Sequence, residues 1–114
     1  MKMIVAVVRP SRLDAVIDAV TRAGASGLTV TEVRGYGRQK GKTEVYRGAE
    51  YAVRLIPKVR LEIAAPDPQV KAIVEAISGA AMTGKIGDGK VFVMDLDGAL
   101  RIRTGERDLA ALGE

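Results

Sequence analysis

Hydrophobic and polar positions along the chain follow two periods, and these predict the order of its elements. Met1 to Arg9 is apolar at nearly every position from Met3 onward, which is typical of a strand buried on both faces. Leu28 to Arg34, rich in Thr and Val, predicts a second strand. Lys58 to Ile63 alternates strictly between polar and apolar residues, and Val91 to Leu96 is also strand-like. The pattern therefore predicts four principal strands.

Two apolar stripes at helical spacing lie between these strands. Ser11 with Asp14 resembles a capping box before the first stripe, and Asp67 with Pro68 predicts an N-cap and a first helical residue before the second. Gly79 costs the second helix roughly 1 kcal/mol relative to alanine, so we expect a weak last turn. The stripes are Leu13, Val16, Ile17 and Val20, then Val70, Ile73, Val74, Ile77 and Ala81.

The resulting order is strand, helix, strand, long loop, strand, helix, strand. It predicts an α+β, ferredoxin-like βαββαβ fold, a split βαβ sandwich with a long loop insertion. Ala99 to Arg103, with Leu100 and Ile102 on one face, predicts a short C-terminal strand, and we expect a mobile tail from Gly105 onward. Two helices can cover only one face of the sheet, whereas the first strand is apolar on both sides. A second copy of the chain is the simplest cover, so we expect a homo-oligomer.

Composition narrows the possible functions. The 114 residues predict one domain, and 47% hydrophobic residues are enough for a core. The chain has no cysteine and no histidine, so it lacks a disulfide framework, a thiolate and the commonest general base. Most hydrolytic and metal-dependent activities are therefore disfavoured. The early apolar run is too short for a signal peptide or a membrane span, which predicts a cytoplasmic protein.

The loop from Gly35 to Tyr51 is rich in glycine and charge, and no helical or strand period runs through it. Between Arg34 and Arg60 there are eight basic and two acidic residues, an excess of six against +4 for the whole chain. Long loops of this kind are usually functional. We interpret it as an anion-sensitive recognition loop. The pI of about 9.6 suggests nucleic-acid binding as a possible function. However, only four aromatic residues are present and the basic residues crowd into the loop, and both features disfavour that function.

A second glycine-rich segment, Thr83 to Lys90, fits part of a phosphate-binding P-loop. Val91 stands where the Mg²⁺-binding Ser or Thr of that motif belongs, and the segment leads from a helix into a strand instead of the reverse. An NTPase P-loop is therefore disfavoured. Closely spaced glycines beside a lysine still suit an anion cradle, and an ordinary tight turn is the alternative.

Two further pairs of residues are compatible with a polyphosphate ligand. Arg101 and Arg103 on a strand would project from one face about 6.6 Å apart, a spacing that suits neighbouring phosphates. A solvated strand face is the plainer interpretation. Arg38 and Gln39 lie at the glycine-rich entrance of the long loop, where the Gln39 oxygen could join a Mg²⁺ held mostly by phosphates and water.

Four blocks of sequence together resemble the signature segments of the PII nitrogen-regulatory proteins, signal-transduction proteins of the GlnB and GlnK type. The resemblance covers residues 1 to 107 without gaps. The blocks are Gly35-Tyr36-Gly37-Arg38-Gln39-Lys40-Gly41, Tyr46-Arg47-Gly48-Ala49-Glu50-Tyr51, Thr83-Gly84-Lys85-Ile86-Gly87-Asp88-Gly89-Lys90 and Arg101-Ile102-Arg103-Thr104-Gly105-Glu106.

The resemblance implies a single PII-like domain over residues 1–114 that assembles as a homotrimer. It implies a recognition loop at about 37–55, a phosphate-binding loop at about 82–90 and a C-terminal loop at about 102–109. ATP and ADP would compete for clefts between subunits, and no catalysis is implied. The implied nucleotide-binding residues are Thr29, Gly37, Arg38, Gln39, Glu62, Ala64 through its backbone, Gly87, Asp88, Gly89, Lys90, Arg101, Ile102 and Arg103.

The resemblance also implies an effector. In such proteins 2-oxoglutarate binds only beside Mg-ATP, chelating a Mg²⁺ that Gln39 also ligates. Tyr51 would be uridylylated or adenylylated by a separate enzyme. Implied partners are an ammonium channel, the adenylyltransferase of glutamine synthetase or other nitrogen-metabolism proteins, with no nucleic acid and with membrane contact only through a partner. The implied 2-oxoglutarate-binding residues are Gln39, Lys40, Gly41, Lys58 and Gly87.

The sequence departs from the family pattern near the loop and beside the helices. Arg54 replaces a usual acidic residue, Leu55 an aromatic one, Ser11 a phenylalanine and Met82 a polar residue. A divergent PII-like sensor of another small anion, controlling carbon metabolism or transport, is therefore the main alternative. A slow ATPase and a nucleic-acid binder are weaker ones. The sequence does not identify the regulated partner, or whether Tyr51 is modified.

Overall fold

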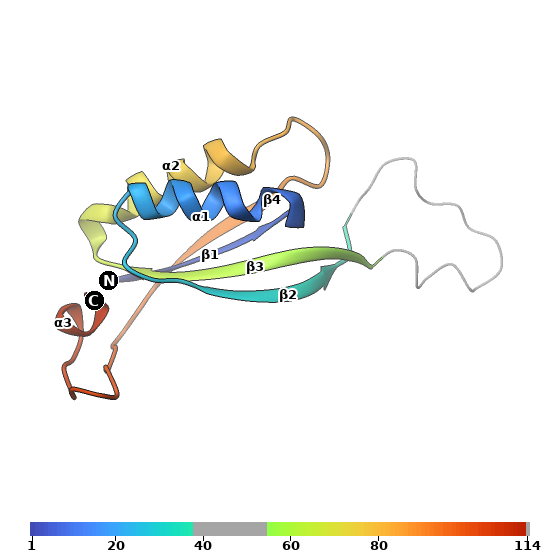
Figure 1. The fold of residues 1–114 in the computed structure, drawn as a ribbon. Coiled ribbons are helices and arrows are strands. Elements are labelled where there is room, and N and C mark those ends of the chain that lie inside the picture. Colours follow the sequence, from blue (N-terminus) through green and yellow to red (C-terminus); the bar gives the residue numbers. More distant parts are fainter. Residues whose placement is uncertain (38–54, 114) are drawn as a thin grey trace.

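The computed structural model describes residues 1–37 and 55–113, and its elements follow the predicted order (Figure 1). The α+β, βαββαβ arrangement is therefore confirmed. The four principal strands are β1 (Lys2–Val8), β2 (Thr29–Gly35), β3 (Ile56–Ala65) and β4 (Gly89–Asp95). The helices are the 3₁₀ turn η1 (Pro10–Arg12), α1 (Leu13–Arg22), α2 (Asp67–Ala81) and α3 (Leu109–Leu112).

The four strands form one antiparallel sheet in the order β2-β3-β1-β4. β1 lies inside the sheet, where Ile4 pairs with Ile63 of β3 and with Val93 of β4. α1 and α2 lie side by side on one face (Figure 1). This is the split βαβ, ferredoxin-like topology that the alternating periods predicted.

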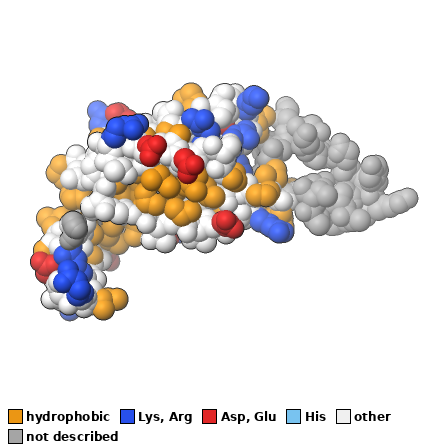
Figure 2. Space-filling view, in the orientation of Figure 1, with side chains coloured by type: hydrophobic (Ala, Val, Ile, Leu, Met, Phe, Trp, Pro, Cys, Tyr) orange, Lys and Arg blue, Asp and Glu red, His pale blue; other side chains and the backbone are white. Residues whose placement is uncertain are grey.

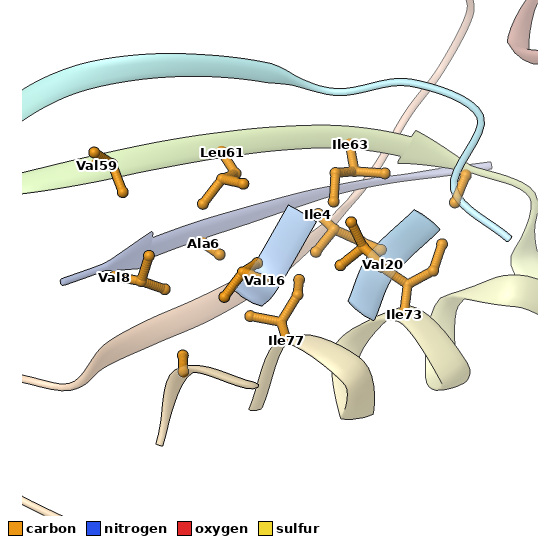
Figure 3. Packing of buried hydrophobic residues seen from close by; sticks show 12 residues of the cluster. Ile4, Ala6, Val8, Val16, Val20, Val59, Leu61, Ile63, Ile73 and Ile77 are labelled. Atoms are coloured by element: carbon orange, nitrogen blue, oxygen red, sulfur yellow. The ribbon is translucent and has the colours of Figure 1, made fainter. Parts of the chain in front are cut away.

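The core lies between the sheet and the two helices. Because successive strand residues face opposite sides, Ile4 and Val8 of β1 point to the helices together with Leu61 of β3. They meet Val16 of α1 and Ile77 of α2, and all five side chains are buried (Figure 3). The apolar stripes of the sequence thus correspond to the buried helix faces.

The opposite face of the sheet carries no helical layer among the described residues (Figure 1), and it is apolar along β1 and β4, whereas β3 adds Arg60 and Glu62 to it. Val5 at its centre is buried, while Phe92 and Met94 on β4 are 50% and 48% exposed. The register places Phe92 beside Val5 and Met94 beside Met3, so these side chains form one apolar surface. The expectation that the helices leave this face uncovered is confirmed.

A separate observation concerns membranes: no helix among the described residues is long and apolar enough to cross one.

Details of the helix starts differ from the prediction. No side-chain cap precedes α1, because residues 10–12 first form the η1 turn, so the capping box of Ser11 and Asp14 is wrong. Asp67 is the first residue of α2 and not its N-cap. Its carboxylate instead accepts a 2.9 Å hydrogen bond from the Met1 amino group. Gly79 does not end α2, which continues to the buried Ala81.

The C-terminal segment also differs from the prediction. Instead of a strand over Ala99 to Arg103, the structure has one isolated bridge, Leu100 to Arg107, and a turn at residues 102–104. A strand needs a paired neighbour, but here the chain folds back on itself, with the amide of Gly105 donating to the carbonyl of Arg101. The tail beyond the bridge then forms α3. The mobility expected from Gly105 onward stays a prediction.

Replacing Leu61 by alanine tests the core. Leu61 is fully buried between the sheet and the helices. We expect Leu61→Ala to lower the free energy of unfolding by about 2–5 kcal/mol, because it removes apolar contacts and leaves a cavity. Urea unfolding at a fixed protein concentration measures this change. Leu55→Ala, the same substitution at an exposed position, should change it by less than about 1 kcal/mol, and equal losses would contradict the assigned core.

Candidate functional site

The Thr83–Lys90 segment forms a loop between α2 and β4 that is organised by Asp88. The Asp88 carboxylate accepts hydrogen bonds from the amides of Thr83 (2.7 Å) and Gly84 (2.9 Å), and from the Thr83 hydroxyl. It also accepts one from Arg9 Nε at 2.9 Å. The bond from the Thr83 hydroxyl, with the others, holds the pKa of Asp88 well below its usual range. The carboxylate therefore fixes the loop, and any phosphate contact of Asp88 has to come from its backbone.

Two glycines let this loop lie close to the sheet. Gly89 has a φ of +114°, and a side chain there would place its Cβ 1.8 Å from the carbonyl oxygen of Val7. Gly87 has a φ of +101°, and its added Cβ would lie 3.3 Å from the Arg9 guanidinium. Only glycine fits both positions. The loop backbone thus lies directly beside two basic side chains.

Arg9 and Lys58 converge on the carbonyls of the loop. Arg9 donates to the Ile86 carbonyl at 2.7 Å, and the Lys58 ammonium donates to the Gly87 carbonyl. Burial lowers the pKa of Lys58, and the nearby Arg9 charge lowers it further. An anion placed here would counter that repulsion and stabilise the charged lysine. Sequence reasoning missed Arg9, although a charged residue that ends an apolar strand was a usable signal.

A cavity of about 900 Å³ opens beside these groups. We call it the glycine-loop cavity. It brings together most of the predicted phosphate-binding residues that the structure describes, with Lys90 and Lys58 supplying positive charge. Its lining residues are Val7, Gly35, Tyr36, Gly37, Lys58, Lys85, Ile86, Gly87, Asp88, Gly89, Lys90 and Phe92.

A second cavity, of about 360 Å³, includes Thr29, Glu62 and Ala64. We call it the C-terminal cavity, because Ala111 to Gly113 form one of its walls. The remaining lining residues are Met3, Ser26, Gly27 and Leu28. Arg101 reaches the same wall, donating to the carbonyls of Ala111 (3.4 Å) and Gly113.

The two cavities lie at opposite ends of the sheet. The glycine-loop cavity adjoins the end of β1 at Val7 and the beginning of β3 at Lys58, whereas the C-terminal cavity adjoins Met3 and Ala64 at the other ends of these strands. Lys58 and Ala64 are six residues apart on β3, or roughly 20 Å at 3.3 Å per residue. One chain therefore places the predicted nucleotide-binding residues in two separate groups.

The arginine pair does not have the predicted geometry. Arg101 precedes the turn and donates to the Glu106 carboxylate at 2.7 Å. Arg103 lies within the turn and is exposed, next to Ile102, which is 94% exposed. They do not share a strand face, because no strand forms here. Figure 2 shows this segment projecting from the body of the molecule, with basic and acidic side chains close together.

Several predicted residues lie outside the described ranges: Arg38, Gln39, Lys40, Gly41, Tyr51 and Arg54. Among the departures from the family pattern, Ser11, Leu55 and Met82 are exposed. No group of three or more His, Cys, Asp or Glu side chains gathers as a metal site among the described residues. The carboxylate of Asp88, within the loop, is already engaged by its hydrogen bonds.

Comparison with known proteins gives a consistent result. Residues 1–106 match the protein family described as nitrogen regulatory protein P-II. The chain is 57% identical to a nitrogen regulatory protein P-II of Rhizobium etli, over 98% of this chain and 100% of that protein. With the same coverage it is 52% identical to nitrogen regulatory protein GlnK and 55% identical to nitrogen regulatory protein P-II 1, both of Escherichia coli K12.

Replacing Asp88 by asparagine tests the loop clamp. The folded-state pKa of Asp88 lies below its unfolded value of about 3.8, so its stabilising effect is present above that pH and is lost as the pH falls further. We expect Asp88→Asn to lower the urea midpoint at neutral pH, and the difference from wild type to shrink as the pH falls from about 4 toward 2. Asp18→Asn, on the exposed face of α1, is the control. A difference independent of pH would contradict the clamp.

Proposed function

Because the chain belongs to the nitrogen regulatory protein P-II family, we propose that it is a non-enzymatic signal-transduction protein that binds ATP and ADP competitively. The observation that supports this most directly is the glycine-loop cavity, where Lys58, Lys90 and Arg9 surround backbone made accessible by Gly87 and Gly89. Asp88 is the one carboxylate among the lining residues and is paired with Arg9, so a polyphosphate would supply the negative charge that the lysines of this cavity still need.

A regulatory role agrees with the names of the relatives, which are regulatory proteins. The chain has no histidine and no cysteine to act as a base or nucleophile. Its partners would be proteins of nitrogen metabolism, such as an ammonium channel or the adenylyltransferase of glutamine synthetase, reached in the cytoplasm through the long loop. Tyr51 would be the site of uridylylation or adenylylation.

We propose that the nucleotide lies between copies of the chain in a homotrimer. The apolar surface formed by Val5, Phe92 and Met94 would need a cover, and no helix of the described residues lies over it. The two cavities then become complementary. The glycine-loop cavity of one copy would meet the C-terminal cavity of its neighbour, which brings Lys90 and Arg101 to one ligand although they are apart in one chain.

We propose 2-oxoglutarate as the effector that binds with Mg-ATP. Lys58 would hold the far carboxylate of the acid beside Gly87, where burial and Arg9 already favour an added negative charge. Mg²⁺, when bound with the triphosphate, would be coordinated by oxygens of both the phosphates and the keto acid. Binding of the two organic ligands is then reciprocally coupled.

Titration calorimetry tests the sensor. We expect 2-oxoglutarate to release heat when added to the protein with Mg²⁺ and ATP, and none with Mg²⁺ and ADP. Lys58→Ala should keep ATP binding and weaken 2-oxoglutarate binding by about tenfold or more, the loss of one charge-assisted hydrogen bond. Lys71→Ala, an exposed lysine on α2, should change neither. No heat from 2-oxoglutarate while ATP still binds would favour a divergent sensor of another anion.

Mixed assemblies test whether the site is shared. Lys90→Ala and Arg101→Ala should each remove most ATP binding, because every cleft loses one of its cations. In trimers containing both variants, one cleft combines the intact Lys90 of one copy with the intact Arg101 of its neighbour. We therefore expect co-expressed, doubly tagged mixtures to regain part of the ATP binding at wild-type affinity. No recovery in mixed trimers that remain assembled would contradict a cleft between copies.

A further inference from the structure

The C-terminal segment closes the cavity that would receive the nucleotide. The Ser26 hydroxyl donates a 2.7 Å hydrogen bond to the carbonyl of Leu112, and both residues line the C-terminal cavity. Ala111 and Leu112 are partly buried there. The wall of this cavity thus consists partly of a tail that lies far from Ser26 in the sequence.

The same tail occupies Arg101. The guanidinium donates to the carbonyls of Ala111 and Gly113 and to the Glu106 carboxylate, and only 21% of the side chain is exposed. An arginine has five N–H donors in a fixed plane. Turning that plane toward a phosphate would break its contacts with the two tail carbonyls. In the arrangement that the structure shows, the tail and an anion compete for one guanidinium.

The tail is attached in a way that permits release. Asp108, at the start of α3, has a φ of +58° and a ψ of −127°, a conformation that side-chain-bearing residues rarely adopt. α3 has only four residues, none of them buried. Segments with so few buried contacts open locally at low free energy.

We propose that residues Asp108 to Gly113 form an intramolecular latch that competes with the nucleotide for the C-terminal cavity and for Arg101. The inference rests on the proposed nucleotide function and adds a regulatory element to it. The apparent association constant for ATP then equals that of the open form multiplied by the fraction of molecules whose latch is open. Any change that loosens the latch then tightens ATP binding without touching the ligand.

Two leucines on the same helical turn provide a matched test. Leu112 lines the cavity and is partly buried, whereas Leu109 is 60% exposed and does not line it. We expect Leu112→Ala in the full chain to tighten ATP binding roughly three- to tenfold, because the open fraction rises. Leu109→Ala should leave it unchanged. Equal affinities of wild type and Leu112→Ala would overturn the latch and leave the nucleotide function standing.

Hydrogen exchange separates a latch from a lid. If the tail competes with the nucleotide, saturating ATP should speed amide exchange over residues 109–113 in the wild-type protein. Slower exchange with ATP would mean that the tail closes over the ligand, and would overturn the proposal. If neither wild type nor Leu112→Ala binds ATP, the proposed function fails and the latch fails with it. Binding by Leu112→Ala alone would support both.

Discussion

The close approach of the glycine loop to the end of β1 is the constraint on which the rest of the glycine-loop cavity depends. Gly89 lies so near the Val7 carbonyl that no side chain fits between them. β1 is hydrogen-bonded to β3 and β4 on its two sides, so its end cannot shift without disturbing both neighbours. Arg9, immediately after that end, is thereby held against Asp88 and Ile86. The position of the Arg9 guanidinium thus follows from the pairing of β1 with its two neighbouring strands.

The sheet also explains why the candidate site is divided. Antiparallel pairing places the end of β1 beside the beginnings of β3 and β4, and its beginning beside their ends. Groups that follow β1 or precede β4 therefore gather at one end, and groups near Met3 and Ala64 at the other. A single chain has no means of joining them. The exposed apolar face between them is where a second copy would lie.

Periodicity predicted the sheet, the two main helices and the core, because burial on one face gives a pattern that local sequence preserves. Leu61 and Ile77 were identifiable from spacing alone. The C-terminal segment was not, because alternation around Leu100 and Ile102 says nothing about whether a neighbouring strand exists to pair with them. Asp67 illustrates a second limit, since its partner is the distant Met1 amino group. Long-range partners leave no local signal.

The same limit applied to the candidate site. Glycines and lysines at residues 84–90 indicated an anion cradle, but the sequence offered no reason to separate the carboxylate of Asp88 from the ligand-facing groups. The four hydrogen bonds that the Asp88 carboxylate accepts show that it is used within the loop. Arg9 was missed because it contacts the loop from an element about 80 positions away.

Both ends of the sheet share one physical feature: their cations donate to neutral carbonyls, although Arg9 also pairs with Asp88 and Arg101 with Glu106. Lys58 and Arg9 donate to the glycine loop, and Arg101 donates to the tail. A hydrogen bond to a charged oxygen is roughly twice as strong as one to a neutral acceptor. In the proposed function, a phosphate or carboxylate would displace these carbonyls, whereas an uncharged ligand would gain little. In the proposed sensor, only the difference between two kinds of hydrogen bond would be released on binding, so binding would stay reversible.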